Sequence, residues 1–299
     1  RQRRKAVASM ARLPGKIIDF HVHLFPDRLF DAIWNSFVKN YGWSIIHRYY
    51  YGECIERLRQ GSVDITVYSN YAHRAGVAGG LNRWNTKILE EHDGLYCFAA
   101  YHPDDPDALE MAGRLVENPR ILGFKLHHLV QNIYPYDSRL WPLYEMVIKK
   151  NKHILFHTGT GPVGNQYVGL EAFTRALDKF PELGATVAHL GAHEYEGFFA
   201  LLDKHPNLYL DTAFCFLPPP YEGYKLGPDY LEKYKSRILY GSDYPNLITP
   251  REVEIENLLK MGLSQDFYDK IFYDNGIHLI RSLTGESGDD AGNQFNYHS

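Results

Sequence analysis

The sequence predicts a single α/β domain with the (β/α)8 TIM-barrel fold. Short runs rich in β-branched and aromatic residues alternate with longer amphipathic stretches along the 299 residues. A barrel of this kind typically needs about 250 residues and closes eight parallel strands into a ring. An open doubly wound sheet shows the same alternation and is the competing fold. The length and the placement of the polar residues described below favour the barrel.

Eight strands are expected in order, each ending near a polar residue or a turn. They cover residues 16–23, 63–70, 95–102, 121–128, 153–159, 185–191, 207–214 and 237–245. Amphipathic stretches between them predict helices, with clear examples at residues 107–118, 138–151, 169–180 and 194–205. The connection after the first strand is long and aromatic. We expect it to cap the barrel mouth or to form a homodimer contact.

One barrel domain is expected over residues 16–284. Residues 1–15 predict a disordered or non-native segment, and the polar, glycine-rich residues 285–299 predict a flexible tail. A formal net charge of -4 argues against nucleic acid as a partner, and no apolar run is long enough to cross a membrane. Three scattered cysteines argue against a disulfide framework, which favours a cytoplasmic protein.

Polar residues recur at the ends of the predicted strands. In the first strand, alternation places Asp19, His21 and His23 on one face, opposite Phe20 and Val22. The later strands end with Lys125, His127, His157, His189 and Asp243. In a parallel barrel these ends all open on one rim, where active sites are built.

The collected side chains have the chemistry of a metal site. Imidazoles and a carboxylate suit zinc or a similar divalent ion, and His21 with His23 offers two nitrogens on one strand. His157 and Asp243 can complete the ligand shell, while Asp19 is expected to orient His21. His189 remains as a general acid–base. Taken singly, each histidine is better explained as a packed polar residue, so the coincidence of positions carries the interpretation.

These residues resemble a known family. The segments DFHVH, GFKLHH, LFHTG, AHLG and YGSDYP, followed by DNGIHLI, are similar to those of the amidohydrolase superfamily, in particular its amidohydrolase-2 branch. The resemblance extends from about Ile17 to Leu283. It implies a metal-dependent barrel enzyme from a group that includes hydrolases and decarboxylases, and it leaves the substrate open.

The resemblance implies a role for each matching residue. His21, His23, His157 and Asp243 would hold the metal, with His189 and Asp243 in catalysis and Asn275 as a structural cap. Zinc is the expected ion, with manganese as an alternative, and one ion is favoured over two. In the binuclear alternative a carbamylated Lys125 and His189 would also be ligands. In the mononuclear one, Lys125 would bind a substrate carboxylate.

We therefore expect a metal-dependent hydrolase that acts on a small, carboxylated or cyclic amide, lactone or ester. A non-oxidative decarboxylase of a hydroxy- or amino-aromatic acid is the alternative, and a non-catalytic metal-binding barrel is a remote one. Lys125, His127 and Arg74 are the expected substrate-binding residues, because Arg74 can clamp a carboxylate with two hydrogen bonds. The expected partner is a small molecule.

Overall fold

The computed structural model describes residues 11–286. The predictions for residues 1–10 and 287–299 fall outside this part of the chain. Residues 11–14 have no regular secondary structure, and α12 ends at Thr284, close to the predicted end of the barrel domain. Among the described residues, no helix combines the length and the apolar character needed to span a membrane.

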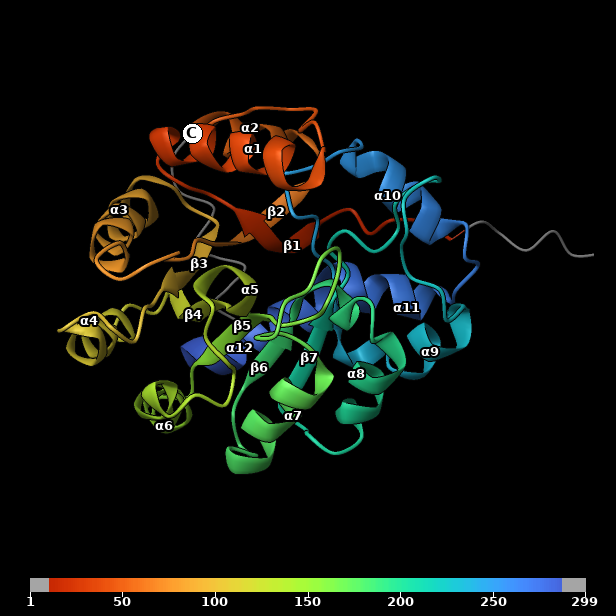
Figure 1. Cartoon of the computed structure of the whole chain (residues 1–299). Coiled ribbons are helices and arrows are strands. Elements are labelled where there is room, and N and C mark those ends of the chain that lie inside the picture. Colours follow the sequence, from red (N-terminus) through yellow and green to blue (C-terminus); the bar gives the residue numbers. More distant parts are fainter. Residues whose placement is uncertain (1–10, 287–299) are drawn as a thin grey trace, which may run out of the picture.

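Eight parallel strands form a sheet in strict chain order, from β1 to β8 (Figure 1). Their bounds are β1 (Ile17–His23), β2 (Val63–Ser69), β3 (Leu95–Ala100), β4 (Ile121–His127), β5 (His153–His157), β6 (Ala185–Val187), β7 (Leu208–Asp211) and β8 (Ile238–Leu239). The ring closes where Phe20 N donates to Tyr240 O at 2.8 Å and His23 N donates to Tyr244 O at 2.8 Å. The predicted barrel is confirmed, and the strand order excludes a doubly wound sheet.

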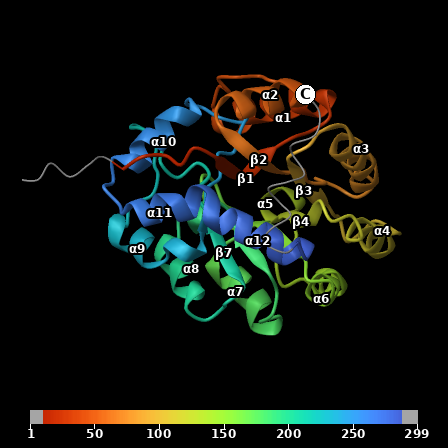
Figure 2. The same cartoon turned by 180° about the vertical axis from the view of Figure 1, so that it is seen from behind.

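Helices surround this barrel (Figures 1 and 2). They are α1 (Asp27–Tyr41), α2 (Tyr51–Gln60), α3 (Ala78–Glu91), α4 (Ala108–Leu115), α5 (His128–Gln131), α6 (Trp141–Lys149), α7 (Leu170–Lys179), α8 (Tyr195–Leu202), α9 (Pro228–Lys233), α10 (Arg251–Leu259), α11 (Gln265–Asp269) and α12 (Asn275–Thr284). The apolar spacing explains their orientation. In α7, for example, Phe173, Ala176 and Leu177 are buried, and residues three and four apart share one helix face.

Two apolar layers hold the fold together. The interior of the barrel contains Ile18, Phe20, Ile65, Val67, Phe98, Leu122, Leu155 and Leu239, and it continues into α12 through Ile277, Leu279, Ile280 and Leu283. A second, larger layer lies between the strands and the outer helices. Because α12 packs against residues near the starts of the strands, it closes the end of the barrel opposite the carboxyl ends of the strands.

Asn275 begins α12 and ties it to the barrel. Its side-chain amide donates to the carbonyls of Lys235 and Ile238, both at 2.7 Å. These bonds satisfy buried backbone acceptors at the start of β8. The geometry agrees with the structural role expected for this residue.

The first strand does not alternate as the sequence predicted. The pairing of β1 with β2 shifts register between Asp19 and Val22, which marks a β-bulge. Phe20 packs inside the barrel, and Val22 packs on the helix side. His21 and His23, on either side of Val22, both reach the mouth. Two neighbours, Phe20 and His21, therefore both face inward. Asp19, the neighbour on the other side of Phe20, does not share a face with the two histidines.

The loop after β5 contains a glycine pattern that usually indicates dinucleotide binding, but its structural setting here is different. Gly159–Gly164 reads GTGPVG, which has the spacing of a dinucleotide-binding motif. However, α7 begins only at Leu170, so no helix N-terminus follows the glycines directly to receive a phosphate. We assign the loop to the rim of the barrel.

Candidate metal centre at the barrel mouth

Three side chains from the two ends of the chain meet at the barrel mouth. His21, His23 and Asp243 each offer a ligand atom, and these atoms lie within 4.8 Å of one another. His23 Nε2 is 2.7 Å from Asp243 Oδ1, His21 Nε2 is 3.2 Å from the same oxygen, and the two Nε2 atoms are 3.3 Å apart. All three residues are buried. Two imidazole nitrogens and a carboxylate oxygen at one point are a donor set that fits a divalent ion.

Asp243 reaches this point by an unusual backbone path. β8 ends at Leu239, so Asp243 lies four residues beyond the strand, where its φ of 69° is left-handed. Its own N donates to His21 O at 2.8 Å, which fixes it beside β1. Burial opposes ionisation, but the adjacent His23 and His21 hold the pKa of its carboxyl well below the usual range. Asp243 is therefore an anion at neutral pH.

Asp211, which sequence reasoning missed, orients His21. Its Oδ2 atom accepts from His21 Nδ1 at 2.7 Å, while its Oδ1 atom accepts from the backbone N–H of His189 at 3.0 Å and of Ala213 at 3.1 Å. Because Nδ1 of His21 carries the donated proton, its Nε2 lone pair is directed towards His23 and Asp243. Burial lowers the pKa of His21 to about 4, so the ring is neutral. Asp211 ends an apolar strand, and that signal was present in the sequence.

Asp19 does not hold the His21 ring, contrary to the prediction. Its Oδ1 atom accepts from the backbone N–H of His21 at 3.3 Å and of Ser242 at 3.0 Å. Burial raises its pKa to about 6, partly offset by the bonds from Ser242 and by the charge of Arg251. Asp19 therefore joins the bulge of β1 to the segment that carries Asp243. It acts on the backbone and not on a ring nitrogen.

His189 lies in a tight turn beyond β6, not within the strand. β6 ends at Val187, and His189 and Leu190 have φ values of 60° and 51° within the turn η2 (Ala188–Gly191). His189 Nδ1 is 2.7 Å from the carbonyl oxygen of Ala213, and a carbonyl can only accept. Nδ1 of the ring therefore carries a proton. In the neutral ring, Nε2 has the lone pair and faces the site.

His157 continues the row of imidazoles. Its Nδ1 atom lies 3.2 Å from His189 Nε2, so Nδ1 is the donor when His189 is neutral. The Nε2 atom of His157 then carries a lone pair. This atom is buried and has no hydrogen-bond partner among the described residues. Burial, with His127 and His189 nearby, holds the pKa of His157 well below its ordinary value. A neutral buried imidazole with an unused lone pair fits a ligand, although His157 is not part of the tight triad.

Lys125 and His127 line the side of the mouth formed by β4. The Lys125 side chain is fully buried, and its Nζ atom has no hydrogen-bond partner in the described chain. Burial lowers its pKa to about 8, while the carboxylates of Asp211 and Asp243 raise it. The His127 ring stacks on the His157 ring, with centroids 4.0 Å apart and planes 12° apart. This side of the mouth combines a buried cation with a flat imidazole surface.

Arg74, the third predicted substrate-binding residue, is exposed on the loop after β2. Its neighbour Tyr71 is the residue of this loop that borders the site. The Tyr71 ring lies 4.7 Å from the His127 ring and 6.2 Å from the His23 ring, measured between centroids. Proximity therefore favours Tyr71 over Arg74 as a wall of the mouth.

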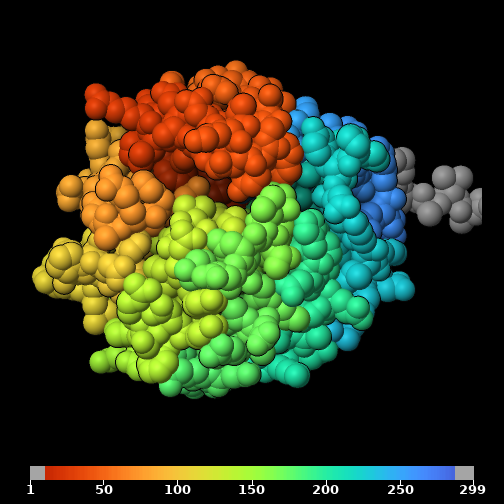
Figure 3. All heavy atoms as spheres, in the orientation of Figure 1, coloured from red at the N-terminus to blue at the C-terminus, as the bar shows by residue number. Residues whose placement is uncertain are grey.

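The long first connection lies beside the mouth, as one of its two predicted roles requires. Trp34 Nε1 donates to Asn246 Oδ1 at 3.1 Å, and Ile46 N donates to Leu247 O at 3.0 Å. The Trp43 ring stacks on Phe214 in the loop after β7, with a centroid distance of 5.6 Å. In Figure 3 this segment, in orange, abuts the green segments that carry the later strands and loops.

The chain matches one protein family and several solved structures. The model of the amidohydrolase-2 family, described as amidohydrolase, matches residues 18–281. No curated protein matches the chain. Solved structures that match share the barrel over nearly their whole length. An uncharacterised TIM-barrel protein from Bordetella bronchiseptica has a TM-score of 0.70 at 20% identity, covering 91% of this chain and 100% of that one.

Two further matches have named activities. A probable 2-pyrone-4,6-dicarboxylic acid hydrolase from Acinetobacter baumannii, with citric acid bound, gives a TM-score of 0.62 at 15% identity and covers 89% of this chain and 99% of that one. A 5-carboxyvanillate decarboxylase from Novosphingobium aromaticivorans, complexed with manganese and a nitrobenzoic acid, gives 0.61 at 11% identity, with coverages of 89% and 96%. Likeness at this level of identity shows a common fold.

Proposed function

The chain belongs to the amidohydrolase-2 family, and from that premise we propose that it is a metal-dependent hydrolase of a small carboxylated substrate. One observation carries the proposal. The ligand atoms of His21, His23 and Asp243 converge within 4.8 Å at the barrel mouth, beside the unpartnered ammonium of Lys125. A divalent ion held by His21, His23 and Asp243, with His157 as a further ligand, would polarise a carbonyl and lower the pKa of water towards about 7.

Each residue then has a task that its contacts support. Lys125 Nζ would pair with the substrate carboxylate, which places the scissile carbonyl near the metal ligands. As water adds to the carbonyl carbon, Asp243 would accept its proton. His189, protonated at Nε2 when the substrate is bound, would donate a hydrogen bond to the developing oxyanion and would then transfer this one proton to the leaving group. Proton return from Asp243 to His189 through solvent completes the cycle.

The ion is expected to be zinc or manganese, and one ion is favoured over two. Lys125 decides between these arrangements. As an ammonium it binds a carboxylate, whereas as a carbamate it would bridge two ions with His157 and His189 as additional ligands. A Lys125 pKa of about 8 leaves most of the side chain protonated at neutral pH. The same lowering of the pKa also increases the neutral amine from which a carbamate would form, so the metal content decides between the two arrangements.

A decarboxylase is the second candidate, and the stacked rings of His127 and His157 favour it. Their flat surface suits a planar aromatic acid. In this reaction the bond between the ring carbon and the carboxylate breaks, CO2 leaves, and a protonated imidazole supplies the proton that replaces it. We assign the role of this donor to His189, whose Nε2 atom lies 3.2 Å from His157 Nδ1.

The test combines metal analysis with a substrate screen. Purified protein is assayed on lactones, amides and hydroxy-aromatic acids, with released acid and released CO2 measured in parallel. Acid release without CO2 supports the hydrolase, and CO2 release supports the decarboxylase. His189→Asn should keep its metal and lose turnover. Activity in protein from which all metal has been removed would contradict both proposals.

A further inference from the structure

A strained turn after β7 presents a backbone carbonyl to His189. Cys215 N donates to Thr212 O at 3.1 Å, which closes a four-residue turn over residues 212–215. Phe214, its third residue, has a φ of 61°. A hydrogen-bonded turn with positive φ at the third position is type II, and glycine or asparagine is the usual residue there. Phenylalanine in this position is strained, and such strain persists only where surrounding contacts impose it.

The direction of one peptide group depends on that strain. The central peptide of the turn joins Ala213 to Phe214, and its carbonyl oxygen accepts from His189 Nδ1 at 2.7 Å. In the common type I turn, the two dihedral angles around this peptide differ by about 150° and 170°, so the carbonyl faces the opposite way. Relaxation of Phe214 to negative φ would therefore take the acceptor away from His189. The tautomer of His189 depends on which turn forms.

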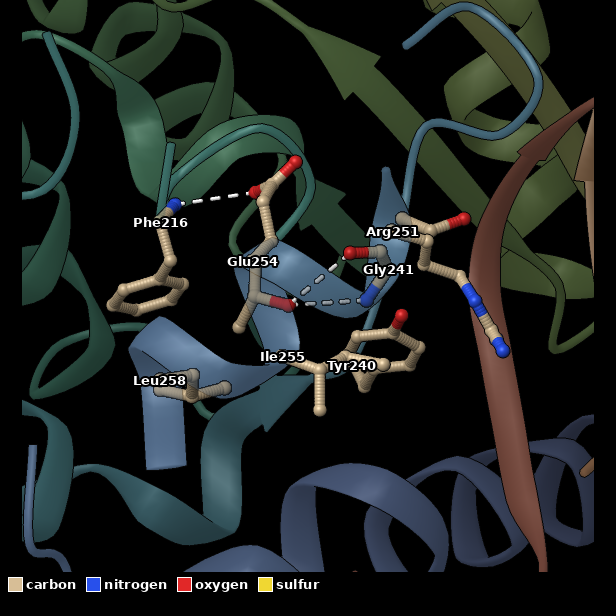
Figure 4. Close-up of a pocket in the computed structure, with 9 residues that line it drawn as sticks. Phe216, Tyr240, Gly241, Arg251, Glu254, Ile255 and Leu258 are labelled. Carbon is tan, nitrogen blue, oxygen red and sulfur yellow. Dashed lines mark hydrogen bonds between the residues drawn. The ribbon is translucent and has the colours of Figure 1, made fainter. Parts of the chain in front are cut away.

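Helix α10 holds the residue that follows the turn. The backbone N–H of Phe216 donates to Glu254 Oε2 at 3.2 Å, and the carbonyl of Phe216 accepts from Asn257 Nδ2 at 2.9 Å. Figure 4 shows Glu254 reaching from α10 to this backbone beside Tyr240 and Arg251. Both polar groups of the Phe216 backbone are thus held by side chains three residues apart on one helix face.

We propose that Glu254 and Asn257 are positioning residues for His189. They hold Phe216 so that the strained turn keeps the Ala213 carbonyl on His189 Nδ1, which leaves the Nε2 lone pair facing the site. Neither residue touches His189, and both act through four residues of backbone. The expected effect on turnover rests on the proposed function, whereas the effect on the ring itself does not.

Glu254 lowers the stability of the fold at its position, which argues that it is kept for a role in the site. Its side chain is buried, and its Oε1 atom has no partner among the described residues. Burial raises its pKa to about 8, and the bond from Phe216 lowers it only in part. A buried carboxyl that is only partly hydrogen-bonded destabilises the fold, so stability alone would favour an apolar side chain here.

The tautomer of His189 can be observed directly. Full-length protein with 15N-labelled histidine is studied by side-chain NMR, and the His189→Asn variant identifies the His189 signal. Wild type and Glu254→Gln, which keeps an acceptor for Phe216 N–H, should show one tautomer protonated at Nδ1. Glu254→Leu should show a mixture of tautomers. Glu256→Gln, an exposed change on the same helix, serves as the matched control and should resemble wild type.

Asn257→Ala provides a second, less buried route to the same result, so the test survives if Glu254→Leu does not fold. An unchanged His189 signal in Asn257→Ala and in folded Glu254→Leu would overturn the proposal. With a substrate in hand, Glu254→Leu should lower kcat by about 10–100-fold, the range seen when groups that orient metal-bound histidines are changed. KM and metal content should stay near wild type, and Glu254→Gln should restore kcat.

Loss of metal from Glu254→Leu would also overturn the proposal, because the change would then act on the whole site. The two proposals fail in different ways. If wild type turns over no substrate, the proposed function fails and the NMR result still decides the role of Glu254. If the tautomer changes while kcat does not, Glu254 positions the ring and His189 is not the catalytic acid.

Discussion

The two sides of the barrel mouth differ in how their polar atoms are used. On the side formed by β1, β7 and β8, His21 and both aspartates are held by several hydrogen bonds, including His21 Nδ1 to Asp211 at 2.7 Å and His23 Nε2 to Asp243 at 2.7 Å. On this first side one ring atom, His23 Nδ1, is buried without a partner in the described chain, and on the side formed by β4 and β5 there are three such atoms. They are Lys125 Nζ, His127 Nδ1 and His157 Nε2.

This difference separates a prearranged half from a receptive half. Two carboxylates and two imidazoles fix each other on the first side, so their geometry exists before any ligand binds. On the second side, a buried ammonium and two ring nitrogens lack partners, which costs stability unless a ligand supplies them. We expect the first half to hold the ion and the second half to recognise the substrate.

Removing the prearranged half should have the largest effect. The double change His21→Ala and His23→Ala deletes two of the three converging ligand atoms, so bound metal and turnover should both be lost. Elemental analysis of purified protein measures the metal. The exposed His73→Ala change provides a control and should retain the ion. Full metal content in the double variant would place the ion elsewhere.

Weakening that half without removing a ligand should have a smaller effect. Asp211→Asn takes away the charge that orients His21, and metal affinity should fall by about 10–100-fold. Asp19→Asn is the comparison, because Asp19 bonds backbone N–H groups and no ring nitrogen. Its metal affinity should change less than that of Asp211→Asn. Competition with a chromophoric chelator measures both, and the reverse order would contradict the assignment of Asp211.

The receptive half is tested by Lys125→Met, which keeps the length of the side chain and removes its charge. KM for a carboxylated substrate should rise by about 10–100-fold, the loss expected for a hydrogen bond between charged groups. Metal content should not change. If the variant instead loses half of the metal that wild type binds, the binuclear arrangement with a carbamylated lysine is correct.

The pH dependence should be the smallest and most specific effect. The pKa of Lys125 falls to about 8 from the ordinary 10.5 because the group is buried. KM for a carboxylated substrate should therefore rise as the pH passes about 8, and this rise should be absent in Lys125→Met.

The same pKa shift makes the stability of the fold depend on pH. Between about pH 8 and pH 10.5 the unfolded chain binds more protons at Lys125 than the folded chain does, so Lys125 makes the free energy of unfolding rise with pH across this window. Urea unfolding of both proteins at pH 7 and pH 9.5 measures this: below the window, Lys125→Met should be the more stable.

Much of this mouth could be predicted from the sequence because each polar residue follows an apolar run. That rule located His21, His23, His157 and Lys125 at or beside strand ends. The same rule also applied to Asp211, whose strand LYLD ends with it. Its role was not predicted because the spacing of residues does not show that the carboxylate of Asp211, and not that of Asp19, reaches the His21 ring.

Other features depended on backbone geometry that residue types do not specify. His189 and Asp243 were expected on strands, but both lie in left-handed turns after short strands. The predicted alternation of inward and outward residues in β1 also fails at Asp19. The bulge adds one residue to β1 between Asp19 and Val22, so the residues before and after it do not follow one two-residue period. A two-residue period holds only while the ladder is regular.

The bulge in β1 has a consequence for how this chain tolerates change in length. Because Phe20 and His21 are neighbours and both face inward, the strand contains one residue more than a regular path would need. Deleting Phe20 would remove the bulge and restore a regular alternation, in which Asp19 and Val22 still lie opposite His21 and His23. Deleting a residue where the ladder is regular would instead exchange the interior and exterior sets on one side of the deletion. Insertions in the surface loops leave that assignment intact. For an engineer or for evolution, the bulge is therefore a position of β1 that can lose a residue without exchanging the two faces of the strand.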